Sequence, residues 1–163
     1  MTAARYRFLS EPWVAQLDRV LAHQRFAGAA KGFVVEIECT NTSGLPSDLV
    51  HFDIDTERVR IAYGPAPAAR RDARVVVDRA VAEALWTEQD PTFATLVYGA
   101  GMIRSDGSPD ALTHLRDLLI SGAKEAMVAA MEPFTEPSRP GPARVRAEAG
   151  RRREATEDPS GGG

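Results

Sequence analysis

Three side chains that could hold a metal ion occupy every second position of one short segment. His51, Asp53 and Asp55 alternate with apolar residues, so in a strand they share one face at a pitch of about 6.6 Å. Imidazole and carboxylate groups bind metals, and His51 or Asp53 could act as an acid or base if it faced inward. The same alternation is typical of a strand with one face in water. We therefore expect a solvent-facing polar edge and no metal site.

Other patterns that would indicate catalysis or a cofactor are absent from the sequence. There is no G-x-S-x-G, and His23 and His114 fall in predicted helices without a visible partner. Gly99 to Gly101 lacks the third glycine of a dinucleotide fingerprint and precedes a predicted strand, which indicates a turn. The single cysteine, Cys39, excludes an internal disulfide and predicts a buried, inert thiol. We identify no catalytic residue and no cofactor.

Length and composition predict one compact domain without membrane spans. The 163 residues suffice to bury a core with an internal cavity, and no apolar run approaches the roughly 18 residues that cross a bilayer. The net charge of -3 gives no attraction to phosphate backbones, so nucleic acid is not an expected partner. Residues 1–10 show no secretory signal, which predicts the cytoplasm. Basic residues are almost all Arg, as in GC-rich bacterial genomes.

The composition changes at Pro133. Residues 135–163 are rich in Pro, Arg, Glu, Ala and Gly and offer little apolar surface to offset the ordering entropy. We therefore expect a folded domain over 1–134 and a disordered tail over 135–163. The arginine run at 151–153 is either simply solvated or a docking motif for an acidic surface or headgroup.

The first half of the domain predicts one helix and three strands. Ser10 can cap a helix that runs to about Gln24, with apolar residues at helical spacing. Residues 32–40, 49–55 and 58–63 then alternate between apolar and polar side chains, which favours an antiparallel meander.

The second half predicts two strands and three helices. Residues 73–77 form a β-branched run that ends at Asp78, which can cap a short helix. Asp90 with the following proline opens a second short helix, and a weak strand pattern covers 101–105. A last helix over 109–132 carries a broad stripe of Leu and Met.

Residues 73–119 carry a recognisable succession of motifs. They read Ala-Arg-Val-Val-Val-Asp, then Ala-Leu-Trp, Asp-Pro-Thr-Phe-Ala, Tyr-Gly, a short strand and a leucine-bearing helix. This succession resembles the sterol carrier protein type two family, and the first half agrees with that family in layout. The resemblance implies an α+β fold: a five-stranded, mostly antiparallel sheet covered on one face by helices, with an apolar cavity between the layers.

The resemblance also implies a function, without naming the cargo. We expect noncatalytic binding or carriage of a lipid, fatty acyl, sterol or polyketide-like molecule in the cavity. An accessory enzyme that acts on a hydrophobic substrate in the same pocket is the alternative, and a docking module with a filled core is a third possibility. Leu112, Leu115 and Leu119 should face the strands, with Met127 and Met131 nearer the mouth. The expected ligand-binding residues are apolar: Trp13, Phe33, Val35, Phe52, Ile54, Leu85, Trp86, Phe93, Leu96, Leu119, Met127 and Met131.

Overall fold

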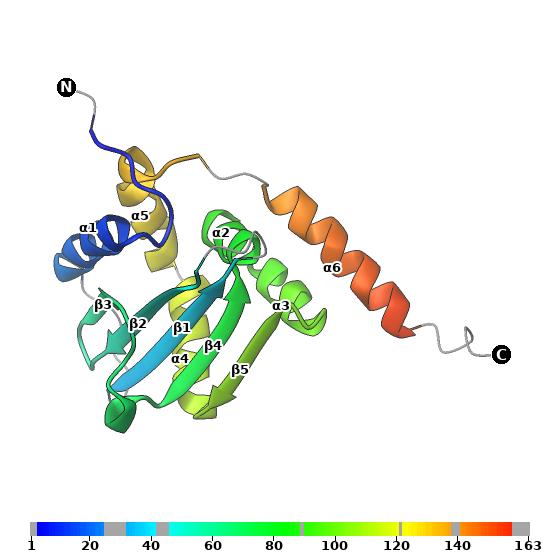
Figure 1. Cartoon of the computed structure of the whole chain (residues 1–163), viewed down its shortest axis with the longest axis horizontal. Coiled ribbons are helices and arrows are strands. Elements are labelled where there is room, and N and C mark those ends of the chain that lie inside the picture. Colours follow the sequence, from blue (N-terminus) through cyan, green and yellow to red (C-terminus); the bar gives the residue numbers. More distant parts are fainter. Residues whose placement is uncertain are drawn as a thin grey trace.

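The computed structural model describes residues 3–24, 32–41, 46–88, 90–120, 122–137 and 141–157, except the side chains of 118–120, 122 and 123. Strands and helices follow one another along the chain, and Figure 1 shows them in sequence colours. The elements are α1 (Glu11–Ala22), β1 (Phe33–Thr40), β2 (Asp48–Ile54), β3 (Val59–Tyr63), β4 (Ala73–Asp78), α2 (Arg79–Thr87), α3 (Pro91–Gly99), β5 (Ile103–Gly107), α4 (Pro109–Ile120), α5 (Gly122–Met131) and α6 (Pro142–Glu157), with short 3-10 turns at Ala68–Arg70 and Glu132–Phe134.

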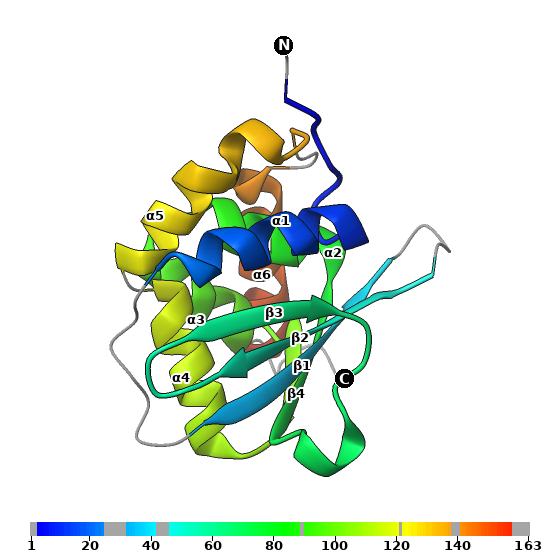
Figure 2. The same ribbon diagram turned by 90° about the vertical axis from the view of Figure 1, so that its left-hand side faces the viewer.

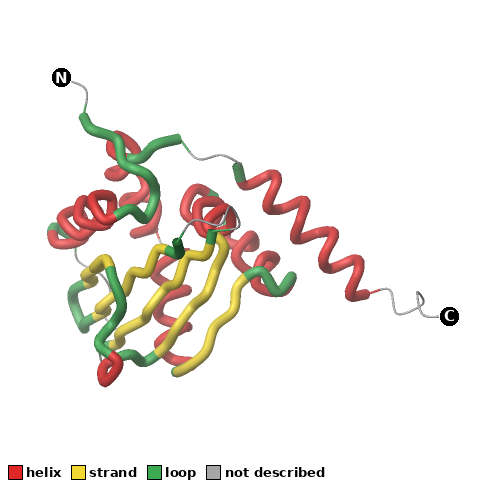
Figure 3. Tube along the Cα trace, in the orientation of Figure 1, coloured by secondary structure: helices red, strands yellow, loops and turns green. Residues whose placement is uncertain are grey.

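The five strands form one sheet in the order β3-β2-β1-β4-β5. β1 lies in the centre, antiparallel to β2 and parallel to β4, and the outer pairs are antiparallel. Figure 3 shows the strands as one continuous twisted layer. The register places Val35 opposite Phe52 on β2 and opposite Ala73 on β4. The predicted five-stranded, mostly antiparallel sheet is confirmed.

Helices cover the apolar face of this sheet. α1 packs on β3, and α4 packs on β1, β4 and β5. Seen from the side, α1 and α5 lie next to each other above the strands (Figure 2). The opposite face carries charged side chains, where Arg74 pairs with Glu36 and Glu38. One face is therefore core and the other polar, as the alternation in the sequence predicts.

Local signals set the starts of the short helices. The Asp78 carboxylate accepts a hydrogen bond from the Ala80 amide at 3.0 Å, and Asp90 accepts one from the Thr92 amide at 2.9 Å. These bonds satisfy amides that have no partner within the helix. Gly107 ends β5 at a φ of 101°, and a Cβ there would lie 2.4 Å from the Asp72 carbonyl oxygen. The strand end therefore requires glycine.

The segment predicted as the last helix, 109–132, is helical on both sides of residue 121. α4 covers Pro109–Ile120 and α5 covers Gly122–Met131, and residue 121 lies outside the described residues. The two described stretches of this apolar stripe pack in different places: α4 packs on the sheet and α5 on α1.

The C-terminal segment also differs from its prediction. Residues 142–157 form α6, where the sequence predicts disorder, and α6 packs against α2 and α3. Val145 and Ala149, one helical turn apart, are buried. The Arg146 guanidinium lies 5.1 Å from the centre of the Phe93 ring. The amino-acid composition of this segment does not predict α6, because only two apolar residues of the helix are buried. Residues 158–163 lie outside the described part of the chain.

Among the described residues, no helix combines the length and the apolar content that crossing a bilayer requires.

Candidate ligand-binding site

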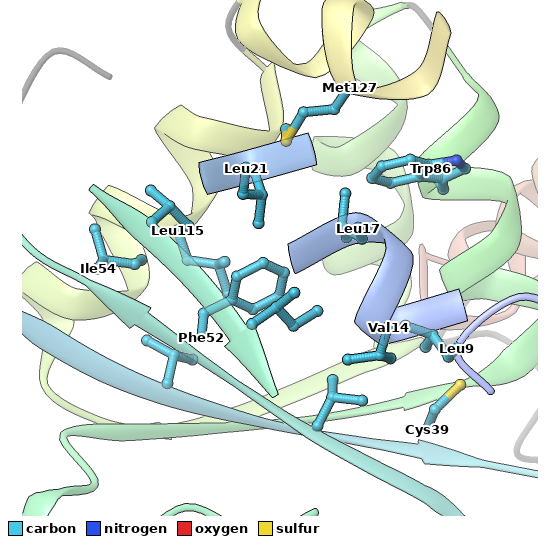
Figure 4. Close-up of a cluster of buried hydrophobic side chains, with 14 of the residues drawn as sticks. Leu9, Val14, Leu17, Leu21, Cys39, Phe52, Ile54, Trp86, Leu115 and Met127 are labelled. Atoms are coloured by element: carbon cyan, nitrogen blue, oxygen red, sulfur yellow. The ribbon is translucent and has the colours of Figure 1, made fainter. Parts of the chain in front are cut away.

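The candidate site is the apolar layer between the helices and the sheet. Figure 4 shows side chains from the strands and from the helices that point toward one another across this layer. Phe52 and Ile54 come from β2, Leu17 and Leu21 from α1, and Met127 from α5. We call the buried side chains of this layer the first cluster: Phe8, Leu9, Trp13, Val14, Leu17, Leu21, Phe33, Val35, Cys39, Val50, Phe52, Ile54, Val59, Ile61, Ala73, Trp86, Ala111, Leu115, Met127 and Met131. Eight of these are predicted ligand-binding residues: Trp13, Phe33, Val35, Phe52, Ile54, Trp86, Met127 and Met131.

The other predicted ligand-binding residues lie elsewhere. Phe93 belongs to a second cluster under α6, with Val77, Val81, Ala84, Val97 and Val145, and Leu85 packs against its edge. Leu96 is half-buried and belongs to neither cluster. The side chain of Leu119 lies outside the described residues. The structure therefore divides the predicted lining between two places.

An ion pair joins α1 to β3, in addition to the apolar packing of α1. The Asp18 carboxylate accepts hydrogen bonds from Arg60 at 2.7 and 2.9 Å and from the Ile61 amide at 3.0 Å. The hydrogen bonds from Arg60 hold the pKa of Asp18 below its ordinary value. This contact fixes the apolar stripe of α1 against β3.

Three aromatic rings close one end of the first cluster. Trp13 lies edge-on to Phe8 at 4.8 Å and to Trp86 at 5.3 Å between ring centres. The Trp13 indole N–H donates to the Thr135 hydroxyl at 2.9 Å, and this hydroxyl donates to the Met131 carbonyl at 2.8 Å. The chain after α5 is thereby joined to the start of α1. Sequence reasoning missed Phe8 and Thr135, because neither belongs to a periodic pattern.

A buried ionic group holds the N-terminal segment in place at this end. Asp48 is 4% exposed. Its carboxylate forms ion pairs with Arg7 and Arg79 and accepts a hydrogen bond from the Tyr63 hydroxyl. Arg79 also donates to the Phe8 carbonyl at 2.6 Å, which positions the Phe8 ring. Burial lowers the pKa of Arg79.

At the other end of the first cluster, Phe33 stacks on His114. The ring centres are 5.0 Å apart and the planes differ by 30°. The sequence places His114 on a helix and indicates no partner for it. In the structure His114 lies on α4, and its partner is the Phe33 ring of β1. Leu115, the next residue, enters the cluster itself.

The two methionines are more deeply buried than predicted. Met127 is 2% exposed and Met131 is fully buried, so neither lies at an open pocket mouth. Both pack among leucines and aromatic rings in the first cluster. Two hollows that the described residues form lie on the other side of the sheet and under α6. The first cluster is a layer of buried side chains that includes both methionines.

The polar residues considered for chemistry face away from the first cluster. The His51 ring nitrogen Nδ1 lies 3.0 Å from the Gly64 carbonyl oxygen, and Asp53 pairs with Arg70 at 3.1 Å. Asp55 is exposed. Neither His51 nor Asp53 can therefore serve as an inward acid or base. Among the described residues, no group of three or more His, Cys, Asp or Glu side chains is placed to hold a metal ion.

Cys39 is the thiol of the first cluster. It is fully buried, and burial raises the pKa of this thiol to about 11. At neutral pH the group is therefore a neutral, apolar side chain and not a nucleophile.

No family model and no curated protein sequence matches this chain. Solved structures do. One, a sterol carrier protein 2, shares 16% identity at a TM-score of 0.50, over 76% of this chain and 95% of its own. The chain has the sterol carrier protein 2 fold. A second, from Thermus thermophilus and described as possibly a sterol carrier protein, shares 17% identity at a TM-score of 0.50, over 84% of this chain and 96% of its own. The resemblance to the sterol carrier protein type two family is thus confirmed as a likeness in structure.

Within the sterol carrier protein 2 fold, this chain places Trp13, Trp86, Met127 and Met131 in the layer between sheet and helices. Charged side chains also gather on the outer sheet face and around α6. The two regions therefore present different chemistry to a ligand.

Proposed function

We propose that the protein binds or carries a hydrophobic small molecule, of the lipid, fatty acyl, sterol or polyketide-like class, between its sheet and its helices. The observation that carries the proposal is the first cluster itself: a layer of aromatic, branched and methionine side chains whose thiol is neutral. Two solved structures of the same fold bear the name sterol carrier protein, one of them only as a possibility. This supports the ligand class.

The side chains of the first cluster can accept a ligand by repacking. Met127 and Met131 have flexible, unbranched side chains that adapt to irregular shapes. An apolar ligand gains about 25 cal/mol per Å² of apolar surface removed from water. Part of this gain is spent in separating side chains that contact each other in the free protein, so binding selects a less populated, opened state. Tight binding requires a ligand large enough to offset that cost.

The two tryptophans provide a direct test. They are the only tryptophans in the chain, and both lie in the first cluster. Dansylated undecanoic acid that binds in this layer should accept excitation energy from Trp13 and Trp86 in a saturable, one-to-one titration. Native mass spectrometry of the purified full chain should also show a co-purified lipid mass. A titration that shows no saturable transfer would contradict the proposal.

A matched pair of substitutions locates the site. Val35 and Val97 are both fully buried, Val35 in the first cluster and Val97 in the second. Val35→Ala and Val97→Ala should lower stability by similar amounts, about 1 to 3 kcal/mol each. Only Val35→Ala should change the affinity for the dansylated acid, by several-fold. If Val97→Ala changes the affinity as much, the probe does not bind between the sheet and the helices at the first cluster.

A further inference from the structure

A hollow lies under α6, at the end of β4 where the chain enters α2. Its walls come from α6, the start of α2 and the neighbouring parts of β4 and β5, and its volume is about 540 Å³. Hollows of 300 to 1,000 Å³ are typical of small-molecule sites. Sequence reasoning missed this hollow because it treated the residues of α6 as a disordered tail.

Arginines dominate the charged groups around this hollow. Arg104 comes from β5, and Arg144, Arg151 and Arg152 come from α6. Four cations therefore face two carboxylates there, Asp78 and Glu148, in a chain whose net charge is -3. The hollow is a positive region on a protein that is negative as a whole.

The local carboxylates leave part of this positive charge available. Glu148 binds both Arg151, at 2.7 Å, and Arg152, at 3.0 Å. Asp78 already caps α2 through the Ala80 amide. In the described part of the chain, Arg104 and Arg144 form no ion pair, and both are exposed. These two guanidinium groups, on two different elements, are free to bind an anion.

The floor of the hollow is apolar. Val76 and Val77 from β4, Val81 from α2, Met102 and Val145 line it beside the arginines. A ligand with one anionic end and one apolar end would match both surfaces. A guanidinium binds phosphate oxygens through two parallel hydrogen bonds, which makes arginine suited to such groups.

We propose that this hollow binds an organic phosphate, with the phosphate group between Arg104 and Arg144 and a short apolar portion against the valines. The ligand bridges β5 and α6 and so ties α6 to the body of the protein. This site is separate from the proposed hydrophobic-ligand site, since its walls share no residue with the first cluster. The phosphate can belong to a dissolved phosphate monoester or to the headgroup of an anionic lipid.

The test measures binding of phenyl phosphate, inorganic phosphate and lipid vesicles to the full chain at low ionic strength. Calorimetric titration follows the two soluble probes, and co-sedimentation follows vesicles of phosphatidylglycerol or phosphatidylcholine. The test variant is Arg104→Gln with Arg144→Gln. The matched control is Arg58→Gln with Arg153→Gln, which removes the same charge from exposed arginines that do not line the hollow. Thermal melts verify that both variants are folded.

We expect phenyl phosphate to bind the wild-type chain more tightly than inorganic phosphate does. The test variant should bind at least about tenfold more weakly, because two charge-assisted contacts are lost, while the control should stay within about twofold. Phosphatidylglycerol binding with the same arginine dependence would assign the headgroup as the source; its absence, with phenyl phosphate bound, would assign a soluble ligand.

Three outcomes would overturn the proposal. The first is that neither phenyl phosphate nor phosphatidylglycerol binds the wild-type chain. The second is that the test and control variants lose affinity equally, which indicates general charge attraction. The third is that inorganic phosphate binds as tightly as phenyl phosphate, which removes the role of the apolar floor. The dansylated fatty acid titration should be unchanged in both variants, so this proposal and the proposed function fail separately.

Discussion

At the scale of single residues, Cys39 shows how the apolar layer controls an ionisable group. Its side chain is fully buried on β1, and burial raises the pKa of the thiol to about 11 from an ordinary 9.0. A charged thiolate would lose its hydration in this layer. The thiol therefore stays protonated in the folded chain at pH values where the unfolded chain has lost the proton.

This difference predicts a pH-dependent loss of stability. The folded-state pKa is the higher one, so the contribution of Cys39 to stability is fully present below pH 9 and is lost as pH rises toward 11. Two pKa units correspond to about 2 to 3 kcal/mol. Denaturant melts of wild type and Cys39→Ala between pH 8 and pH 11 should show the steeper decline in wild type. Parallel declines would mean that the thiol ionises without cost in the fold.

The sequence predicts which strand residues face the core but not which distant residues meet. Val35, Phe52 and Ile54 follow a period of two, and all three are buried in the first cluster. The contact of Trp13 with Thr135 joins positions 122 residues apart. Thr135 belongs to no periodic pattern in the sequence, so only the three-dimensional structure reveals its contact with Trp13.

At the scale of elements, α6 is the helix that the amino-acid composition does not predict. Its buried stripe consists of Val145 and Ala149, and pairs such as Arg152 with Glu148 support the rest of the helix. Strands and capped helices were predictable because alternation and Asp caps extend over whole segments. The different packing of α4 on the sheet and of α5 on α1 was not, because one apolar stripe runs through both segments in the sequence.

The docking of α6 is tested by a charge at its buried stripe. Val145→Asp places a carboxylate against Phe93 and Val97, whereas Ala147→Asp places it on an exposed position of the same helical turn. The carboxylate would lose hydration against these apolar side chains, so Val145→Asp should release α6 and lower stability by about 1 to 3 kcal/mol. Ala147→Asp should change stability by less than about 1 kcal/mol.

Amide hydrogen exchange of residues 142–157 measures directly whether α6 has been released from the rest of the protein. Protection should be lost in Val145→Asp and retained in Ala147→Asp. If wild-type α6 already exchanges as fast as a free peptide, or if the two variants behave alike, α6 does not dock through this stripe in solution.

At the scale of the whole molecule, two apolar clusters share one sheet. Ile37 on β1 and Ala82 on α2 pack against both clusters. α2 also sends Trp86 into the first cluster and Val81 and Ala84 into the second. Neither cluster can therefore lose its packing without disturbing elements that the other cluster needs.

This sharing predicts a single cooperative unfolding transition. Tryptophan fluorescence reports the first cluster, because Trp13 and Trp86 both lie there, while far-ultraviolet circular dichroism reports all helices and strands. Urea melts followed by the two signals should coincide, as in two-state unfolding of a small domain. Val97→Ala, which weakens only the second cluster, should then shift both curves equally. A dichroism curve that shifts while the fluorescence curve stays in place would show that the clusters unfold as separate units, and that Ile37 and Ala82 do not couple them.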